Sequence, residues 1–219
     1  MKNLDGLAKK FKTDKSSTKE ERHNIPGYTG HDYCRIYELV TSHIRNEVQS
    51  VLELGVFKGS SLRMWAEWFP KANIHGFDIK PELKFDNDRI KAYKVDATSD
   101  LAVKICKKIS PDIIIDDAAH TMNSHFKSFN NLWPQLSKGG LYIIEDMLTC
   151  YIKPKRYGGS PTHNSEKERS IEWIAELSKA LNYEYYSKQE QDHILKQYPY
   201  LKDIDYILSY KSLVVIKKK

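Results

Sequence analysis

The sequence has few cysteines and no long hydrophobic run. Cys34, Cys106 and Cys150 are far apart, odd in number and never spaced as CxxC. This argues against a disulfide framework and against a cysteine-ligated zinc site, so we expect reduced cysteines. No apolar stretch approaches the ~18–20 residues that span a bilayer, and the N-terminus lacks a signal-peptide core. We therefore expect a cytoplasmic protein without a membrane span.

The composition is that of a globular protein with an excess of basic residues. Of the 219 residues, 40% are hydrophobic and 29% are charged, and the formal net charge is +6. The lysines are spread along the chain, so we interpret the charge as a solvated, lysine-rich surface. The alternative is affinity for an anionic substrate or a membrane surface.

Short β-branched runs alternate with amphipathic stretches, as in an α/β domain. The segment 205–218 predicts two strands joined around Tyr210-Lys211. The pattern as a whole predicts a Rossmann-like, mostly parallel seven-stranded sheet with a C-terminal antiparallel hairpin. The other predicted strands are 50–55, 73–78, 90–95, 111–117 and 139–146, and the predicted helices are 59–69, 99–109, 121–136 and 165–182.

We expect residues 1–219 to form a single domain, because the sequence has no repeat and no low-complexity linker. Two segments, 12–30 and 150–165, lack clear periodicity, and loops of that length are often lids. The expected organisation is an N-terminal lid or cofactor segment (1–30), a cofactor-binding and catalytic core (31–149), a substrate loop (150–165) and a C-terminal helix with the hairpin (166–219).

A turn with two glycines, ELGVFKGS at 53–60, follows the first predicted strand. Gly55 permits a sharp turn, and Gly59 lets the next helix approach a ligand. The spacing is not GxGxxG, and Glu53 would repel a pyrophosphate but attract the amino group of a methionine moiety. The turn therefore indicates S-adenosyl-L-methionine rather than a dinucleotide, with a generic strand–turn–helix glycine pair as the alternative.

Further acidic residues follow the next strands. Asp78 ends the second strand, where a carboxylate can accept both ribose hydroxyls of a nucleoside. Asp96 follows the third strand and is placed to contact the adenine end. Asp78 taken alone could be an ordinary strand-end acid, but its combination with the turn favours cofactor binding. We also assign Ser60 and Asp116 to the cofactor pocket.

Acidic clusters end two strands that are neighbours in the usual order of this fold: IIIDDAAH at 113–120 and IIED at 143–146. Asp117 and Asp146 are thus expected within reach of one cation. Paired carboxylates repel unless a proton or a metal neutralises them, and oxygen ligands favour Mg²⁺ or Mn²⁺ over zinc. Glu145 alternates away from Asp146 in an ideal strand, so only a twist at the strand end would bring both to the metal.

His120 lies three residues after Asp117, at the start of the next predicted helix. An imidazole suits a general base at neutral pH, and a sugar hydroxyl is a poor nucleophile until its proton is removed. The alternative is that His120 caps the helix or completes the metal shell. We interpret His125 as a surface or packing residue.

Several stretches resemble the macrolide-sugar O-methyltransferases of the mycinamicin type and related bacterial glycan and capsule methyltransferases. The resemblance covers about residues 1–150 and is strongest in the IDD-x-x-H and IED motifs. It implies that Asp117, Glu145 and Asp146 hold magnesium and that His120 is the base. It also implies that Lys15, in the TDK segment, and Tyr28 lie near the cofactor or the lid. The matching stretches are FKTDK (11–15), GYTGHDYCRIYE (27–38), ELGVFKGSSLRMWAEWFP (53–70), IDDAAHTMNSHFKSF (115–129) and GGLYIIED (139–146).

The sequence departs from that family in two ways. Ala118-Ala119 stands where Gly-Ser is usual, and the long N-terminal extension of the macrolide enzymes is absent, so their oligomer and macrolide substrate are not carried over. By residue chemistry alone, Lys15 and Tyr28 are ordinary loop residues.

Together, these features predict a class I S-adenosylmethionine-dependent O-methyltransferase that uses Mg²⁺ or Mn²⁺. The expected acceptor is a sugar hydroxyl of a bacterial glycan or a glycosylated small molecule. The alternatives are an RNA or protein methyltransferase, which only the basic charge supports, and a protein that binds S-adenosylmethionine without catalysis. DNA is not an expected substrate, because the motif [DNS]PP[YFW] is absent. The sequence does not identify the sugar or the hydroxyl that is methylated, and it does not decide whether the protein forms a homodimer.

Overall fold

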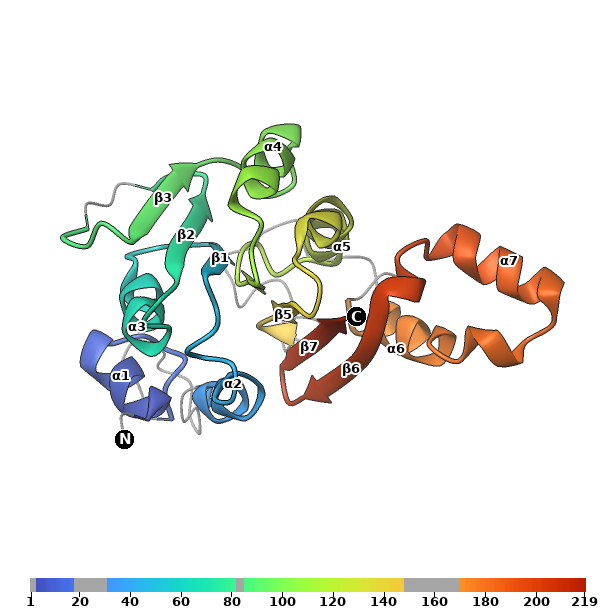
Figure 1. The fold of residues 1–219 in the computed structure, drawn as a ribbon, viewed down its shortest axis with the longest axis horizontal. Coiled ribbons are helices and arrows are strands. Elements are labelled where there is room, and N and C mark those ends of the chain that lie inside the picture. The colour runs from blue at the N-terminus through green and yellow to red at the C-terminus, as the bar shows by residue number, and fades with distance from the viewer. Residues whose placement is uncertain (1–2, 18–30, 82–84, 148–169) are drawn as a thin grey trace, which may run out of the picture. The chain divides into compact units, whose positions relative to one another are not determined.

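We describe the protein from a computed structural model that places residues 3–17, 31–81, 85–147 and 170–219. The chain divides into two compact units, Met1–Val95 and Asp96–Lys219. Its seven strands belong to one mixed sheet, mostly parallel with an antiparallel C-terminal pair (Figure 1). The predicted fold class is confirmed, whereas the single domain stays a prediction.

The first unit is built on three parallel strands in the order β3-β2-β1. Every residue of β1 is buried, as in a strand that is covered on both faces. Leu54 pairs with Phe77, so β1 and β2 end at the same edge. The strands are β1 (Ser50–Leu54), β2 (Asn73–Asp78) and β3 (Ile90–Lys94), and the helices are α1 (Leu4–Phe11), α2 (Cys34–Thr41) and α3 (Ser60–Trp68).

The helices of this unit pack through aromatic side chains of α3. Trp65 is fully buried, and its ring centroid lies 4.7 Å from that of Tyr37 in α2. The indole N–H of Trp68 donates a hydrogen bond to the Thr41 hydroxyl at 2.9 Å. These contacts hold α3 in place and thereby fix the glycine-containing turn that precedes it.

Helix α1 lies inside the predicted lid segment 1–30, yet it is a packed helix. The Asn3 side chain caps its first turn, and Lys12 ends it in the left-handed region at φ 56°. It buries Leu4, Leu7 and Ala8. Residues 4–11 therefore contribute to the core of the first unit, which the sequence analysis did not anticipate.

The second unit is built on four strands in the order β4-β5-β7-β6. β4 and β5 are parallel, and β7 runs antiparallel to both β5 and β6. Asp116 pairs with Ile144, so β4 and β5 also end at one edge. The strands are β4 (Ile113–Asp116), β5 (Leu141–Ile144), β6 (Ile204–Tyr210) and β7 (Leu213–Lys218).

An aromatic cluster forms the core of the second unit. The ring centroid of Phe129 lies between 4.9 and 5.2 Å from those of Trp133, Tyr142, Trp173 and Tyr200. The cluster joins α5, α6 and β5. The helices are α4 (Asp100–Ile109), α5 (Met122–Leu132), α6 (Ser170–Ala180) and α7 (Lys188–Gln197), with short 3₁₀ segments η1 (Trp133–Gln135), η4 (Tyr183–Tyr185) and η5 (Leu201–Asp203).

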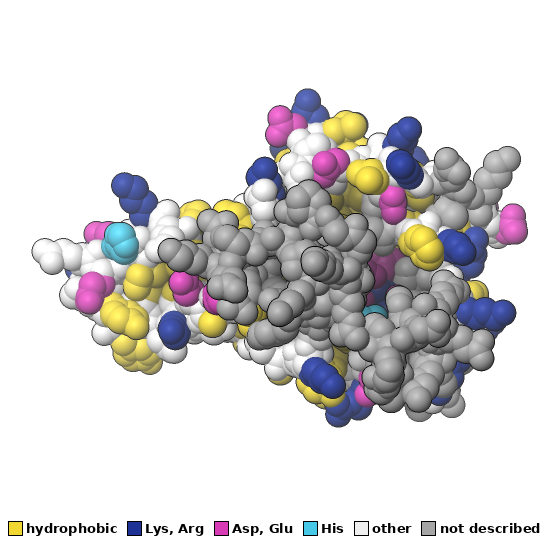
Figure 2. Space-filling model, turned by 180° about the vertical axis from the view of Figure 1, so that it is seen from behind, with side chains coloured by type: hydrophobic (Ala, Val, Ile, Leu, Met, Phe, Trp, Pro, Cys, Tyr) yellow, Lys and Arg dark blue, Asp and Glu magenta, His cyan; other side chains and the backbone are white. Residues whose placement is uncertain are grey.

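Surface features agree with the composition. Within the described residues, no helix is both long and apolar enough to cross a membrane. On the face drawn in Figure 2, the Lys and Arg side chains that are coloured lie scattered among those of Asp and Glu. Cys34 and Cys106 are buried and form no disulfide within the described residues, and Cys150 lies outside them.

Candidate metal centre and cofactor turn

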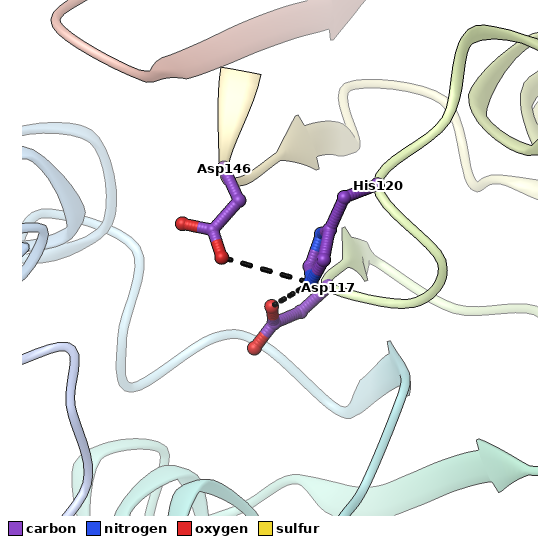
Figure 3. Close-up of side chains that lie close together, drawn as sticks. All are labelled: Asp117, His120 and Asp146. Atoms are coloured by element: carbon purple, nitrogen blue, oxygen red, sulfur yellow. Dashed lines mark ion pairs between the residues drawn. The ribbon is translucent and has the colours of Figure 1, made fainter. Parts of the chain in front are cut away.

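Asp117, His120 and Asp146 come together beyond the ends of β4 and β5 in the second unit (Figure 3). His120 Nε2 lies 3.8 Å from Asp117 Oδ1 and 3.6 Å from Asp146 Oδ2. One ligand atom from each residue lies within 4.8 Å of the other two. The side chains are 23%, 27% and 18% exposed, in chain order, so a ligand can reach them. Two carboxylates and an imidazole are a suitable donor set for a divalent cation.

The backbone turns sharply at two members of this group. His120 and Asp146 have φ values of 51° and 55°, in the left-handed region. β5 ends at Ile144, so the strand alternation that would separate Glu145 from Asp146 no longer applies. Glu145 is buried and does not belong to the group. Its predicted role as a metal ligand stays a prediction, and the described geometry favours Asp146.

The start of α5 positions His120. Thr121 is the N-cap residue, and its side chain accepts a hydrogen bond from the Ser124 N–H at 3.2 Å. His120 therefore comes immediately before the helix, at the end of the loop that begins with Asp117. The sequence predicted this placement, and the structure shows it.

Asp116, assigned to the cofactor pocket by the sequence, is fully buried at the end of β4. Its Oδ2 accepts hydrogen bonds from the hydroxyls of Ser128 and Tyr142, the latter at 3.1 Å. Its Oδ1 accepts one from the Ala118 N–H at 3.4 Å. Burial raises the pKa of Tyr142 well above its usual value, and the nearby Asp116 carboxylate adds to that rise, so the phenol stays a donor.

His125, interpreted from the sequence as a surface or packing residue, is fully buried one turn into α5. Its Nδ1 lies 2.9 Å from the Ser170 hydroxyl, at the first residue of α6. Burial lowers its pKa, an effect that the carboxylates of Asp116 and Asp146 oppose. His125 is therefore a packing residue that ties α5 to the beginning of α6.

The turn at residues 53–60, called here the cofactor turn because the sequence predicts cofactor binding there, has the left-handed backbone conformation that glycine favours. Gly55 and Gly59 have φ values of 84° and 71°, which side chains with a Cβ rarely adopt. Gly55 N–H donates to the Phe77 carbonyl at 2.8 Å, which joins the turn to β2. Gly59 is the N-cap of α3, and Ser60 is its first residue, so both are placed at the start of that helix.

Glu53 is buried at the end of β1 beside Lys15. The Glu53 Oε1 and Lys15 Nζ atoms are 3.5 Å apart, and the two side chains are 0% and 1% exposed. Glu53 Oε2 accepts a hydrogen bond from the Ser61 hydroxyl at 2.6 Å. The structure thus brings together Lys15, suggested only by the family resemblance, and the acid of the turn.

Asp78 holds the cofactor turn from the end of β2. Its Oδ2 accepts hydrogen bonds from the N–H groups of Val56 at 2.9 Å and Phe57 at 3.1 Å, and Oδ1 accepts one from Lys80 at 2.8 Å. Burial acts to raise the pKa of Asp78, but these backbone donors bring it below its usual value. The carboxylate therefore stays charged at neutral pH.

The remaining predicted residues are placed as follows. Asp96 is exposed in the second unit, where its Oδ1 accepts hydrogen bonds from the backbone and hydroxyl of Thr98, both at 2.8 Å. Tyr28 and the substrate loop 150–165 lie outside the described residues, as does most of the predicted lid 12–30.

Sequence reasoning missed the buried hydroxyls that support the acidic residues: Ser61, Ser128 and Tyr142. Ser128 lies on the buried face of α5, four residues after Ser124 and one before Phe129. A small polar residue on an otherwise buried helical face is the signal that could have found it. Tyr142 gives no such signal, because tyrosine is common in buried strands.

Curated sequence relatives are sugar O-methyltransferases. A tetracenomycin-C rhamnosyl 3'-O-methyltransferase of Streptomyces olivaceus is 33% identical over 171 residues, covering 73% of this chain and 43% of that protein. Mycinamicin VI 2''-O-methyltransferase of Micromonospora griseorubida is 40% identical over 117 residues, covering 49% and 29%. No protein-family model matches the chain.

Solved structures of the MycE methyltransferase, from the mycinamycin biosynthetic pathway, share the whole described fold. The complex with Mg and SAH aligns with a TM-score of 0.76 at 26% identity, covering 99% of this chain and 55% of that one. The complex that also holds mycinamycin VI gives 0.75 at 28% identity. A caffeoyl-CoA O-methyltransferase from Staphylococcus aureus, at 16% identity and a TM-score of 0.51, shares the fold alone.

The comparisons confirm the resemblance drawn from the motifs and the Rossmann-like class I methyltransferase fold. The chain spans less than half the length of the curated relatives named above and about half of the MycE chain.

Proposed function

We propose that the chain is an S-adenosylmethionine-dependent O-methyltransferase that binds Mg²⁺ and methylates a sugar hydroxyl. The observation that carries the proposal is the group of Asp117, His120 and Asp146 beyond the ends of β4 and β5. The similarity to a methyltransferase solved with Mg and SAH supports it.

The metal-binding part of the proposal fits the residues present. Asp117 and Asp146 supply two carboxylates that would repel each other in the absence of a cation. Their partial exposure leaves room for water or an acceptor oxygen in the remaining coordination positions. Bound there, Mg²⁺ would act as a Lewis acid that makes an acceptor hydroxyl more acidic.

The cofactor-binding part uses the turn of the first unit. Asp78 accepts backbone hydrogen bonds from the N–H groups of residues 56, 57, 79 and 80, and these hold its carboxylate at the end of β2, where we propose that it also meets a ribose hydroxyl. The turn between Gly55 and Gly59 exposes backbone at the start of α3. We propose that Glu53, together with Lys15, presents opposite charges to the amino and carboxylate groups of the methionine moiety. Ser60, Asp96 and Tyr28 are further cofactor residues in this proposal, whereas Asp116, also predicted from the sequence, is enclosed by protein donors.

His120 is the proposed general base. Its Nε2 lies 3.6–3.8 Å from the two carboxylates, which places the imidazole beside the proposed metal ligands. The imidazole takes the proton of the acceptor hydroxyl while the methyl group passes from the sulfonium to the oxygen. The alternative is that His120 is a third metal ligand. The position of its Nε2 close to both carboxylates is the observation that favours this alternative.

A sugar hydroxyl is the acceptor class that the relatives favour. One relative is named for the 3' position of a rhamnosyl tetracenomycin and another for the 2'' position of mycinamicin VI, and one MycE structure holds mycinamycin VI. These names agree on a sugar and disagree on the position, so the proposal stops at the class of acceptor. A cytoplasmic location and a homodimer belong to the same proposal.

Two measurements on the purified chain test this function. Calorimetry should show binding of S-adenosylhomocysteine, and Mn²⁺ should bind with an affinity that Asp117→Asn and Asp146→Asn both reduce. Transfer of a tritiated methyl group to a panel of nucleotide sugars and glycans should need the metal and stop with chelator. Asp205→Asn, an exposed acid on β6, is the matched control. Full turnover in chelator, or methylation of RNA or protein instead of sugars, would overturn the proposal.

A further inference from the structure

The buried carboxylate of Asp116 contacts each of the segments that carry the metal group. Ser128, one of its hydroxyl donors, lies on α5, and Tyr142, the other, lies on β5. The N–H of Ala118, in the loop after β4, donates to the carboxylate at 3.4 Å. The Asp116 carbonyl accepts a further hydrogen bond from the Glu145 N–H at 3.0 Å.

These partners are close in sequence to all three members of the group. Ala118 lies between Asp117 and His120, Glu145 directly precedes Asp146, and Ser128 lies on the helix that begins after His120. The side chain and the backbone carbonyl of Asp116 therefore link the loop after β4, helix α5 and the end of β5. Asp116 itself is fully buried and is not a member of the group.

The backbone of the group needs such support. His120 and Asp146 both adopt left-handed φ values, which are costly for residues with a Cβ. Neighbouring contacts must hold these conformations, and two of them, at Ala118 and Glu145, are made by Asp116.

The hydrogen bonds also explain why a charge is tolerated at this buried position. A buried carboxylate is costly unless it is hydrogen-bonded, and hydroxyl donors to a charged acceptor are among the stronger bonds. The Ser128 hydroxyl has one proton and also lies 2.8 Å from the Ser124 carbonyl, so the charged acceptor is the stronger competitor for it.

We propose that Asp116 is a positioning residue that holds Asp117 and Asp146 in the arrangement that binds a divalent cation, with His120 beside them. This inference rests on the proposed metal-dependent function. It replaces a direct cofactor contact as the main role of Asp116, because its carboxylate is wholly enclosed by protein donors.

The test is Mn²⁺ binding to the full chain, measured by electron paramagnetic resonance without substrate, with S-adenosylhomocysteine affinity measured in parallel by calorimetry. Asp116→Ala should weaken Mn²⁺ binding by about 10- to 100-fold, the range typical for residues that support metal ligands. The affinity for S-adenosylhomocysteine should change by less than about twofold, and Asp116→Asn, which keeps the shape and one acceptor oxygen, should recover part of the loss.

Tyr142→Phe keeps the proposal testable if Asp116→Ala does not fold. It removes one donor to the carboxylate and should weaken Mn²⁺ binding severalfold. The matched control is Tyr198→Phe in the same unit, which removes a hydroxyl donor to Glu176 at 2.9 Å. Tyr198→Phe should leave the Mn²⁺ affinity unchanged even if it lowers the urea midpoint as much as Tyr142→Phe does.

The outcomes separate the inference from the function on which it rests. If the wild-type chain binds Mn²⁺ and both Asp116→Ala and Tyr142→Phe bind it equally well, the positioning role is overturned and the function stands. If Asp116→Ala loses S-adenosylhomocysteine affinity with Mn²⁺ binding intact, Asp116 is a cofactor residue instead. A wild-type chain that binds no Mn²⁺ overturns the metal dependence, and the inference with it.

Discussion

The ammonium group of Lys15 lies 3.5 Å from the carboxylate of Glu53, with both side chains buried. Lys15 follows α1, and Glu53 lies in β1, so the pair joins the N-terminal segment to the cofactor turn. The buried negative charge of Glu53 therefore has a positive charge, that of Lys15, next to it. The residues of the turn itself do not include this lysine.

Breaking this ion pair should destabilise the protein. Lys15→Met removes the ammonium group that lies 3.5 Å from the buried Glu53 carboxylate and should lower the free energy of unfolding by roughly 3–5 kcal/mol. Urea denaturation measures the change, and Lys15→Met combined with Glu53→Gln should recover much of it. Lys188→Met, which breaks an exposed pair with Asp192, should cost no more than about 0.5 kcal/mol. Equal losses for the two lysine variants would contradict the prediction.

Replacing Asp78 should weaken cofactor binding. Asp78→Ala removes the proposed ribose acceptor and the carboxylate that holds the N–H groups of Val56 and Phe57. We expect a loss of ~1.5–3 kcal/mol, or roughly 10- to 150-fold in the dissociation constant of S-adenosylhomocysteine. Calorimetry with Asp88→Ala, an exposed acid of the same unit, provides the control. An unchanged affinity would remove Asp78 from the cofactor site.

Removing His120 should separate catalysis from binding. As the general base, His120→Ala should lower the methyl-transfer rate by roughly 10²–10⁴ while the affinities for S-adenosylhomocysteine and Mn²⁺ stay nearly the same. Single-turnover kinetics and Mn²⁺ titration are the measurements, with His193→Ala on exposed α7 as control. A large loss of Mn²⁺ affinity would instead make His120 a metal ligand.

The buried His125 should make stability depend on pH. Burial lowers its pKa, so below about pH 6.5 the unfolded chain takes up a proton that the folded chain does not. The free energy of unfolding should therefore decrease as the pH is lowered below about 6.5, until the folded-state pKa is reached. This residue contributes at most about 1.4 kcal/mol per pH unit to the decrease. His125→Asn keeps a possible partner for Ser170 but cannot titrate.

Urea denaturation at pH 7.5 and 5.5 checks this expectation. The wild-type chain should lose more stability on acidification than His125→Asn, and His193→Asn should behave like wild type. Identical losses in the wild type and His125→Asn would show that His125 does not contribute.

The sheet and the acidic edge could be predicted from the sequence because their signals are local. Continuous apolar runs such as PDIIIDD identify buried parallel strands, and parallel strands place their carboxyl ends at one edge. This was sufficient to bring Asp117 and Asp146 together. The hairpin was also predicted, with its turn at Lys211-Ser212 rather than Tyr210-Lys211. The glycines of the cofactor turn have the positive φ values that their residue type suggests.

Other features depend on long-range contacts that no local pattern encodes. The position of Asp146 beside Asp117 and His120 depends on where β5 ends and on a left-handed φ at Asp146. The two hydroxyl donors to Asp116 lie 12 and 26 residues away. Helix α7 was not predicted, because it buries no residue and therefore has no apolar stripe to recognise.

The pairing of β5 with β7 has a consequence for synthesis of the protein on the ribosome. β5 ends two residues before Asp146, and its partner β7 begins only at Leu213, so the edge of β5 stays uncovered while the intervening chain is made. A nascent chain at that stage presents an apolar strand, LYII, with unpaired backbone groups. Such an edge can pair with a strand of another chain until β7 emerges.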